Sequence, residues 1–251
     1  MNITGNTILI TGGGSGIGRA LAEALHKAGN QVVIAGRREQ LLHEVTTANP
    51  GMEALLLDIQ DKDDVAAFAR QAVESFPALN AVVHNAGIMR SEAVAAGDFL
   101  TNAEETIATN LLGPIRLTAA LLPHLLKQER AAILTVSSGL AFVPLATTPT
   151  YSATKAAIHA WSMALREQLK ATPVEVIEIA PPYVQTELLG PQQAVDPAAM
   201  PLAEFTSEVM SLLESGPTSG EIIVERCKPL RFAAENGQVA AIFAQLAAQH
   251  G

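Results

Sequence analysis

The chain has 251 residues, 49% of them hydrophobic, and its formal net charge of −9 is not offset by any basic run. This length fits one domain over residues 1–251 with a large core, and the negative charge excludes surfaces that bind nucleic acid or anionic membranes. A single cysteine, Cys227, with no signal-peptide pattern and no apolar run of about 18 residues, predicts a soluble, cytoplasmic protein without an internal disulfide or a membrane span.

Short apolar runs alternate with longer amphipathic stretches along the chain. The expected strands are 7–10, 31–35, 54–57, 81–84, 132–136, 174–179 and 221–225. The expected helices are 18–28, 38–48, 62–76, 104–127, 152–169 and 202–214. Several of the strand runs are apolar at consecutive positions, as in strands that are buried on both faces. The pattern predicts an α/β, doubly wound Rossmann-type fold, with a seven-stranded parallel sheet flanked by helices on both faces.

The first expected strand runs directly into the glycine-rich segment TGGGSGIG at 11–18. Gly12, Gly16 and Gly18 allow the backbone to turn tightly and to approach a pyrophosphate, whose charge the N-terminus of the following helix favours. No Gly-Lys-Ser/Thr follows, so a loop for nucleoside triphosphates is not expected. Together with Ser15 and Ile17 the loop is a candidate dinucleotide site. The alternative is a tight turn that binds no ligand.

A tyrosine and a lysine lie four residues apart in the run TYSATKAAIHAW, as Tyr151 and Lys155, and Ser138 lies thirteen residues before the tyrosine. A free tyrosine has a pKa of about 10, too high for a base at neutral pH. On a helix, positions four residues apart share a face, so the ammonium group is expected to lower the pKa of the tyrosine. Ser138 would hold a substrate oxygen while Tyr151 exchanges a proton with it. The spacing alone is weak evidence, because surface helices carry such pairs by chance.

The glycine spacing after Thr11 resembles that of the short-chain dehydrogenase/reductase family, and the resemblance covers nearly the whole chain. The family's cofactor-binding positions correspond here to Asp58 and Ile59 on the adenine side and to Asn85, Ala86 and Gly87 after the fourth strand. Its catalytic residues correspond to Asn110, Ser138, Tyr151 and Lys155, and the serine-to-tyrosine spacing prefers Ser138 over Ser137. The matches occur in the family's order along the chain. The resemblance therefore implies an enzyme.

The cofactor is expected to be NADP, with NAD as the less favoured alternative. Where an acidic residue after the second strand would bind the NAD ribose, this chain has Gly36 followed by Arg37. A guanidinium group suits a phosphate through paired, charge-assisted hydrogen bonds. Arg38 is expected to face solvent on the following helix, with assistance to Arg37 as the alternative. Many NADP-preferring relatives carry a second basic residue before the middle glycine, and Ser15 occupies that position here.

The family resemblance also implies the division of roles in catalysis. Tyr151 is the general acid in reduction and the general base in oxidation, and Ser138 polarises the reacting oxygen. Lys155 lowers the pKa of Tyr151 and holds the nicotinamide ribose. Asn110 anchors a water molecule on a proton path, or stabilises a helix kink; the two roles are compatible. The hydride belongs to the cofactor, so the protein supplies position and electrostatics. No metal site is expected.

The segment VIEIAPPYVQTEL resembles the family's stretch beside the nicotinamide, with Pro181, Val184 and Thr186 as contact positions. Pro182 replaces the usual glycine and lacks an N–H donor, so that contact is not carried over. Tyr183 is expected either to face the substrate or to pack against the next segment. Within the family, the runs SSGLAFVPLATTPTYSATKAAIHA and VEVIEIAPP resemble bacterial oxidoreductases named after the operon for D-alanylation of teichoic acid, a label that implies no particular substrate.

The remaining segments concern the substrate and assembly. Residues 187–201 show no periodicity and are expected to form a lid over a small-molecule carbonyl or alcohol, with a plain surface loop as the alternative. His159 and Trp161 are expected to pack in a helix-to-helix interface of a homodimer or homotetramer, as relatives assemble. Residues 237–249 read as an added amphipathic helix. The rival function is an NADP-binding sensor on the same fold without turnover.

Overall fold

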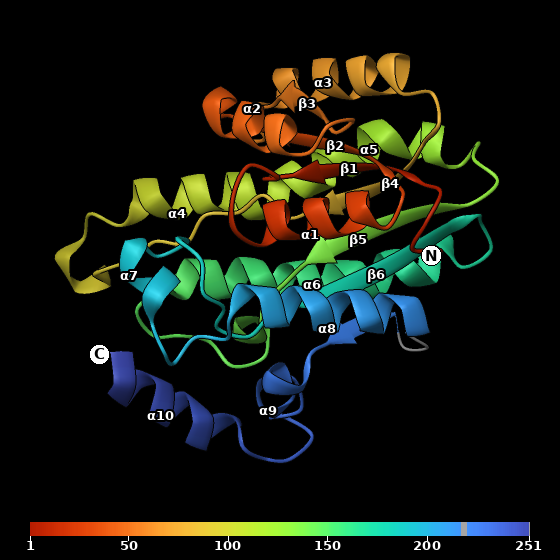
Figure 1. Ribbon diagram of the computed structural model, residues 1–251. Coiled ribbons are helices and arrows are strands. Elements are labelled where there is room, and N and C mark those ends of the chain that lie inside the picture. Colours follow the sequence, from red (N-terminus) through yellow and green to blue (C-terminus); the bar gives the residue numbers. More distant parts are fainter. Residues whose placement is uncertain (217–219, 251) are drawn as a thin grey trace.

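In the computed structural model, the described residues 1–216 and 220–250 form one sheet of seven parallel strands (Figure 1). The strand order is β3-β2-β1-β4-β5-β6-β7, so the direction of winding reverses between β1 and β4. The strands are β1 (Thr7–Thr11), β2 (Gln31–Gly36), β3 (Glu53–Leu56), β4 (Leu79–His84), β5 (Ala131–Val136), β6 (Val174–Ala180) and β7 (Glu221–Ile223). The predicted doubly wound fold is confirmed, and the reversal creates a crevice at the carboxyl ends of β1 and β4.

Helices cover both faces of the sheet because the central strands are apolar on both faces. On β1, Ile8 and Ile10 point to one side, with α1 and α8, and Leu9 points to the other, with α3 and α5. The longer helices are α1 (Gly16–Lys27), α2 (Glu39–Ala48), α3 (Lys62–Ser75), α4 (Leu100–Ile107), α5 (Gly113–Leu125), α6 (Pro149–Leu169), α8 (Leu202–Ser215) and α10 (Val239–His250). The short helices are α7 (Pro191–Val195) and α9 (Lys228–Arg231). Of these described helices, none has the length and apolar character needed to cross a bilayer.

The helix predicted at 104–127 differs from the structure. The helical path starts earlier, at Leu100, ends at Leu125, and contains a π-helical turn, Ala108–Leu112, between α4 and α5. Pro114 explains the irregularity, because it has no N–H to donate to the carbonyl of Asn110 four residues before it. The turn therefore places Asn110 where the regular helical ladder is broken.

The segment 187–201 is not the irregular loop that the sequence predicts. It contains α7, and Gln193 anchors it from inside that helix, since its Nε2 donates to the carbonyl of Val184 over 2.8 Å. An isolated bridge joins Val184 to Met200, which closes the segment at its far end. Whether it acts as a lid stays a prediction.

The C-terminal helix is present as α10, which starts two residues later and ends one residue later than the predicted range (Figure 1). Of its residues, Leu246 packs against a small apolar cluster that contains Met89, Leu145 and Tyr151. The helix thus contacts the neighbourhood of the predicted catalytic tyrosine.

Candidate active site

Two adjoining cavities open along the carboxyl edge of the sheet. The larger, about 690 Å³, is lined by Arg37, Arg38 and Ile59, which follow β2 and β3. The smaller, about 440 Å³, is lined by Ser138, Tyr151 and Lys155 among others. The glycine loop contributes to both. The structure therefore brings the predicted dinucleotide loop and the predicted catalytic residues to one continuous crevice.

The glycine loop forms a tight cradle between β1 and α1. Gly12 has a φ of 69° and Gly16 a φ of 53°, in the left-handed region that favours glycine. A Cβ on Gly18 would lie 2.3 Å from Nδ2 of Asn85 and 2.4 Å from the carbonyl oxygen of Gly12. Asn85 itself is tied to β1, because its Nδ2 donates to the carbonyl of Thr11 over 3.0 Å.

This cradle fits a dinucleotide pyrophosphate. Ser15, at the N-cap of α1, makes no side-chain capping bond, so the first N–H groups of that helix remain available to a ligand. The residues at the end of β4 close the other side: the backbone N–H groups of Asn85 and Ala86 both donate to the hydroxyl of Thr11 over 3.1 Å. A backbone this close to the crevice is what an extended phosphate ligand requires.

Replacing Gly18 by alanine is expected to weaken NADPH binding and to destabilise the fold by about 1–3 kcal/mol, because the added methyl group overlaps backbone and Asn85. Fluorescence titration with NADPH and thermal unfolding would measure both effects. Gly36→Ala is the control for stability, since its added methyl would meet nothing nearer than 3.9 Å. Equal unfolding temperatures for the two variants would contradict the close packing of the loop.

The two arginines after β2 lie on either side of the larger cavity. Nη1 of Arg37 lies 3.9 Å from the carboxylate of Asp58, and both side chains are about half exposed. Arg38 is exposed, as expected for a residue that faces solvent, but its side chain also has a partner. Its Nη2 donates to Oγ of Ser15 over 2.8 Å. Arg38 precedes the first residue of α2, so its side chain is free to turn back toward the glycine loop. No local pattern in the sequence indicates this contact, because it joins residues 23 apart.

Tyr151, Lys155 and Ser138 lie together, but their electrostatics differ from the prediction. Burial raises the pKa of Tyr151 to about 12, and a hydrogen bond with Ser138 opposes that rise. The expected lowering of the tyrosine pKa by Lys155 is not observed. Nζ of Lys155 lies 5.6 Å from the tyrosine ring centroid and donates to the carbonyl of Val136 over 2.7 Å, and burial lowers its own pKa to about 8. Desolvation of both groups thus outweighs their mutual attraction.

The serine at the end of β5 that reaches the tyrosine is Ser138. It lines the smaller cavity, and its Oγ also accepts a hydrogen bond from the backbone N–H of Leu140 over 3.1 Å. Oγ of Ser137 instead points toward β6, 3.4 Å from the carbonyl of Ile179. The preference for Ser138 from spacing agrees with this geometry.

Asn110 holds the loop after β4 by both ends of its amide. Its Oδ1 accepts from the N–H of Ile88 and its Nδ2 donates to the carbonyl of the same residue, each over 2.9 Å. Nδ2 also lies 3.3 Å from the hydroxyl of Thr154 on α6. The side chain would lie 3.3 Å from a Cβ on Gly87, which shows how closely Asn110 approaches the predicted cofactor segment. Asn110 therefore links the π-helical turn to the loop after β4.

The segment after β6 borders the smaller cavity through Pro181, Val184 and Thr186. Cγ2 of Thr186 would lie 3.5 Å from a Cβ on Gly16, so this segment touches the glycine loop. Oη of Tyr183 donates to Asp196 over 3.0 Å. From the sequence, Tyr183 is expected either to face the substrate or to pack against the next segment. This bond shows contact with the 187–201 segment.

The interface role of His159 and Trp161 stays a prediction, and His159 also has a contact inside the fold. Its Nδ1 lies 2.8 Å from Oε2 of Glu178, a carboxylate inside the sheet that the sequence analysis did not single out. A glutamate within a strand of apolar residues, VEVIEIA, was the only available signal.

Comparison with known proteins agrees with this geometry. Residues 6–196 match the model of the family described as short chain dehydrogenase. An uncharacterized oxidoreductase, DltE, from Bacillus subtilis is 45% identical over 194 residues, which cover 75% of each chain. An uncharacterized oxidoreductase from Staphylococcus epidermidis is 34% identical over 182 residues, 72% of this chain and 78% of that protein.

Solved structures of similar proteins extend the agreement over nearly the full length. A short chain dehydrogenase from Burkholderia cenocepacia, in complex with NADP, has a TM-score of 0.81 at 28% identity and covers 98% of this chain and 99% of that one. A short chain dehydrogenase/reductase from Burkholderia phymatum, in complex with NAD, has a TM-score of 0.83 at 19% identity and covers 96% of both chains. The second likeness shows the fold alone.

Proposed function

Since this chain belongs to the short-chain dehydrogenase family, and is thus an oxidoreductase that uses a nicotinamide cofactor, we propose that it interconverts a carbonyl and an alcohol with NADP(H). The observation that carries the proposal is the meeting of Ser138, Tyr151 and Lys155 in the cavity that the glycine loop also lines. An NADP-binding sensor without turnover is not favoured, because a sensor has no need of a proton donor there.

Tyr151 is the proton donor in this proposal. With a pKa raised by burial to about 12, the phenol keeps its proton at neutral pH. An alkoxide that develops on a reduced carbonyl is a stronger base than a phenolate, so the proton moves to the substrate oxygen. Tyr151 can therefore act as the proton donor in the reductive direction. The nicotinamide supplies the hydride.

The neighbouring residues position the reacting oxygen and the cofactor. Ser138 already hydrogen-bonds with Tyr151, so its hydroxyl can donate to the same substrate oxygen. Lys155 lines the smaller cavity, and its ammonium, which now donates to the Val136 carbonyl, would hold the ribose hydroxyls of the cofactor. Asn110 holds the loop after β4, which borders the site of the cofactor and of the reacting oxygen.

The preference for NADP rests on the two arginines. Arg37 and Arg38 line the larger cavity, and the bond of Arg38 to Ser15 brings a second guanidinium to the loop position where the chain lacks a basic residue. Two guanidinium groups favour a 2′-phosphate over a free ribose hydroxyl. The relative with NADP in its structure supports the same choice.

The substrate in this proposal is small and uncharged to moderately polar. Tyr151 packs in an apolar cluster with Met89 and Leu145, and Leu140 and Leu246 lie against that cluster. A charged group beside the reacting carbon would lose its hydration there without a partner. An alkyl or aryl carbonyl fits this wall better than a phosphorylated sugar does.

Homo-oligomerisation and a cytoplasmic location are part of the same proposal. Leu100, Ile107 and Leu112 expose 61%, 38% and 38% of their surfaces along the α4–α5 helical path. Ile107 also lines an apolar cavity of about 490 Å³ between this path and α6. Burial of this face against a second copy would explain why apolar side chains lie there.

Screening a panel of aldehydes, ketones, diketones and sugars for loss of NADPH absorbance tests the function. We expect turnover with several apolar carbonyl compounds and little with phosphorylated sugars. NADPH binding without turnover on any carbonyl or alcohol of the panel would support the sensor instead.

A further inference from the structure

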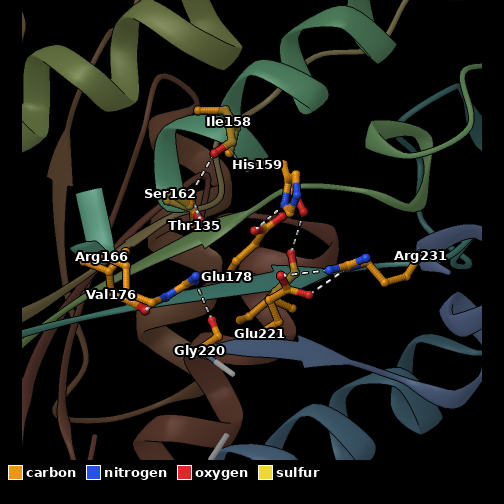
Figure 2. A network of polar contacts seen from close by, with 12 residues as sticks. Thr135, Ile158, His159, Ser162, Arg166, Val176, Glu178, Gly220, Glu221 and Arg231 are labelled. Atoms are coloured by element: carbon orange, nitrogen blue, oxygen red, sulfur yellow. Dashed lines mark hydrogen bonds and ion pairs between the residues drawn. The ribbon is translucent and has the colours of Figure 1, made fainter. Parts of the chain in front are cut away.

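Glu178 is a fully buried carboxylate at the centre of β6. Its strand neighbours in register are Thr135 on β5 and Glu221 on β7. The positions around it in the same strand, Val176, Ile177 and Ile179, are apolar and buried. Figure 2 shows the side chain of Glu178 between His159, which reaches down from α6, and the pair of Glu221 and Arg231.

The hydrogen bonding of Glu178 is incomplete among the described residues. Oε2 accepts from Nδ1 of His159 over 2.8 Å, whereas the buried Oε1 has no hydrogen-bond partner there. Taking a carboxylate out of water costs several kcal/mol, and one hydrogen bond does not offset that cost. An apolar residue in this strand would be more stable, so stability does not explain Glu178.

The second acidic residue of the cluster is already neutralised. Glu221 accepts from Arg231 at both carboxylate oxygens, over 2.7 and 3.2 Å. The ligand atoms of His159, Glu178 and Glu221 lie within 4.8 Å of one another, a spacing that a metal ion could use. The guanidinium on Glu221 opposes a second cation at that place, so the cluster is two ion pairs rather than a metal site.

Glu178 is connected to Lys155 along two routes, helix α6 and strand β5. On α6, Lys155 and His159 are four residues apart and share a face. Nζ of Lys155 donates to the carbonyl of Val136 over 2.7 Å, and the residue before Val136, Thr135, is the register partner of Glu178. Lys155 thus contacts β5 at Val136, and His159 contacts β6 at Glu178, one register position earlier.

We infer that Glu178 and His159 form a buried, proton-sharing pair whose negative member holds Lys155 in its ammonium form. They are positioning residues, since neither lines the two cavities of the active site. The other charged or titratable groups that face the pair are Glu221, Arg231, Arg166 and Cys227. Arg166 is occupied by the carbonyls of Val176 and Gly220, and Arg231 by Glu221.

The titration behaviour of these groups agrees with the inference. Burial lowers the pKa of Lys155 to about 8, and attraction to Glu178 opposes that fall. The hydrogen bond to Glu178 raises the pKa of His159 above its ordinary value. Below that pKa the pair is neutral; as pH rises through it, His159 loses its proton, the pair becomes negative, and the ammonium of Lys155 is held more strongly.

The test follows the charge of Lys155 itself, by NMR of isotope-labelled lysine side chains over a pH series. The chain has six lysines, and loss of one signal in Lys155→Arg identifies the resonance. In Glu178→Gln we expect Lys155 to titrate about one pH unit lower, because the buried negative charge that opposes the effect of burial on its ammonium is removed. Glu178→Asp, which keeps the charge, should restore most of the shift.

Glu221→Gln is the matched control, because it removes a charge from the register neighbour of Glu178 and should shift the titration of Lys155 much less than Glu178→Gln does. The wild-type protein gives a second readout: the Lys155 resonance should show a second inflection where His159 titrates. An unshifted Lys155 in Glu178→Gln overturns the inference. If Glu178→Gln does not fold, the wild-type protein decides: a Lys155 titration curve without a second inflection also overturns the inference.

The role of Lys155 in turnover rests on the proposed function, but its charge does not. If the carbonyl panel shows no turnover while Lys155 shifts as expected, only the proposed function fails. If turnover is found, the pH limb of kcat/KM that follows Lys155 should move to lower pH in Glu178→Gln, with thermal stability compared against Glu221→Gln. A shift of equal size in both variants would show a merely structural effect.

Discussion

Replacing Tyr151 by phenylalanine is expected to lower kcat for carbonyl reduction by about 100-fold to 10,000-fold, the usual contribution of a positioned acid. The ring stays in its apolar cluster with Met89 and Leu145, so the fold and the cofactor site should be preserved. The dissociation constant for NADPH should change by less than about threefold, because the variant removes a proton donor rather than a charge. Steady-state kinetics and fluorescence titration would measure the two quantities separately.

The chain offers a matched control for this prediction. Tyr183 is its second tyrosine, and its hydroxyl is bonded to Asp196. Tyr183→Phe should keep most of the wild-type kcat. A Tyr151→Phe enzyme that turns over a substrate at the wild-type rate would show that another group donates the proton.

Replacing Arg37 by aspartate is expected to weaken NADPH binding by about 100-fold and NADH binding far less. The variant removes charge-assisted hydrogen bonds to the 2′-phosphate, each worth about 1.5–3 kcal/mol, and adds a repelling carboxylate next to Asp58. With NADH, an aspartate at this position can accept from the ribose hydroxyls instead. Binding titrations with both cofactors at one ionic strength would give the ratio.

Two further variants separate a local from a general effect of charge. Arg38→Gln should lower NADPH affinity by a smaller factor, because it leaves Arg37 in place but loses the guanidinium beside Ser15. Arg70→Asp makes the same charge change on the exposed side of α3 and should alter neither affinity. Equal losses of NADPH and NADH affinity in Arg37→Asp would exclude a phosphate-binding role.

The sequence predicts most of the fold because its signals are local and strong. Consecutive apolar residues such as Leu9 and Ile10 identify a buried parallel strand, and a glycine loop directly after that strand identifies the crevice. The same holds for Ser138 and Tyr151, whose spacing brings them together once β5 and α6 are in place. These features depend on short segments of the chain.

The features that the sequence does not predict depend on contacts between distant segments. The bond from Arg38 to Ser15 requires the pairing of β1 with β2, which brings the segments after these strands together, and the pairing of His159 with Glu178 requires the register of β6 under α6. The raised pKa of Tyr151 has the same origin, because burial is a property of the assembled fold. The prediction from the spacing of Tyr151 and Lys155 considers the effect of the ammonium on the phenol, but not the desolvation of both groups by burial.

The π-helical turn at Ala108–Leu112 makes the number of residues in this segment matter as well as the identity of Asn110. Such a turn contains one residue more than a regular helical turn, so deleting a single residue would rotate α4 by about 100° relative to α5. The amide of Asn110 would then leave Ile88, and the exposed apolar side of α4 would swing away from its present direction. A one-residue deletion there would therefore displace both the crevice and the outer helical surface at once.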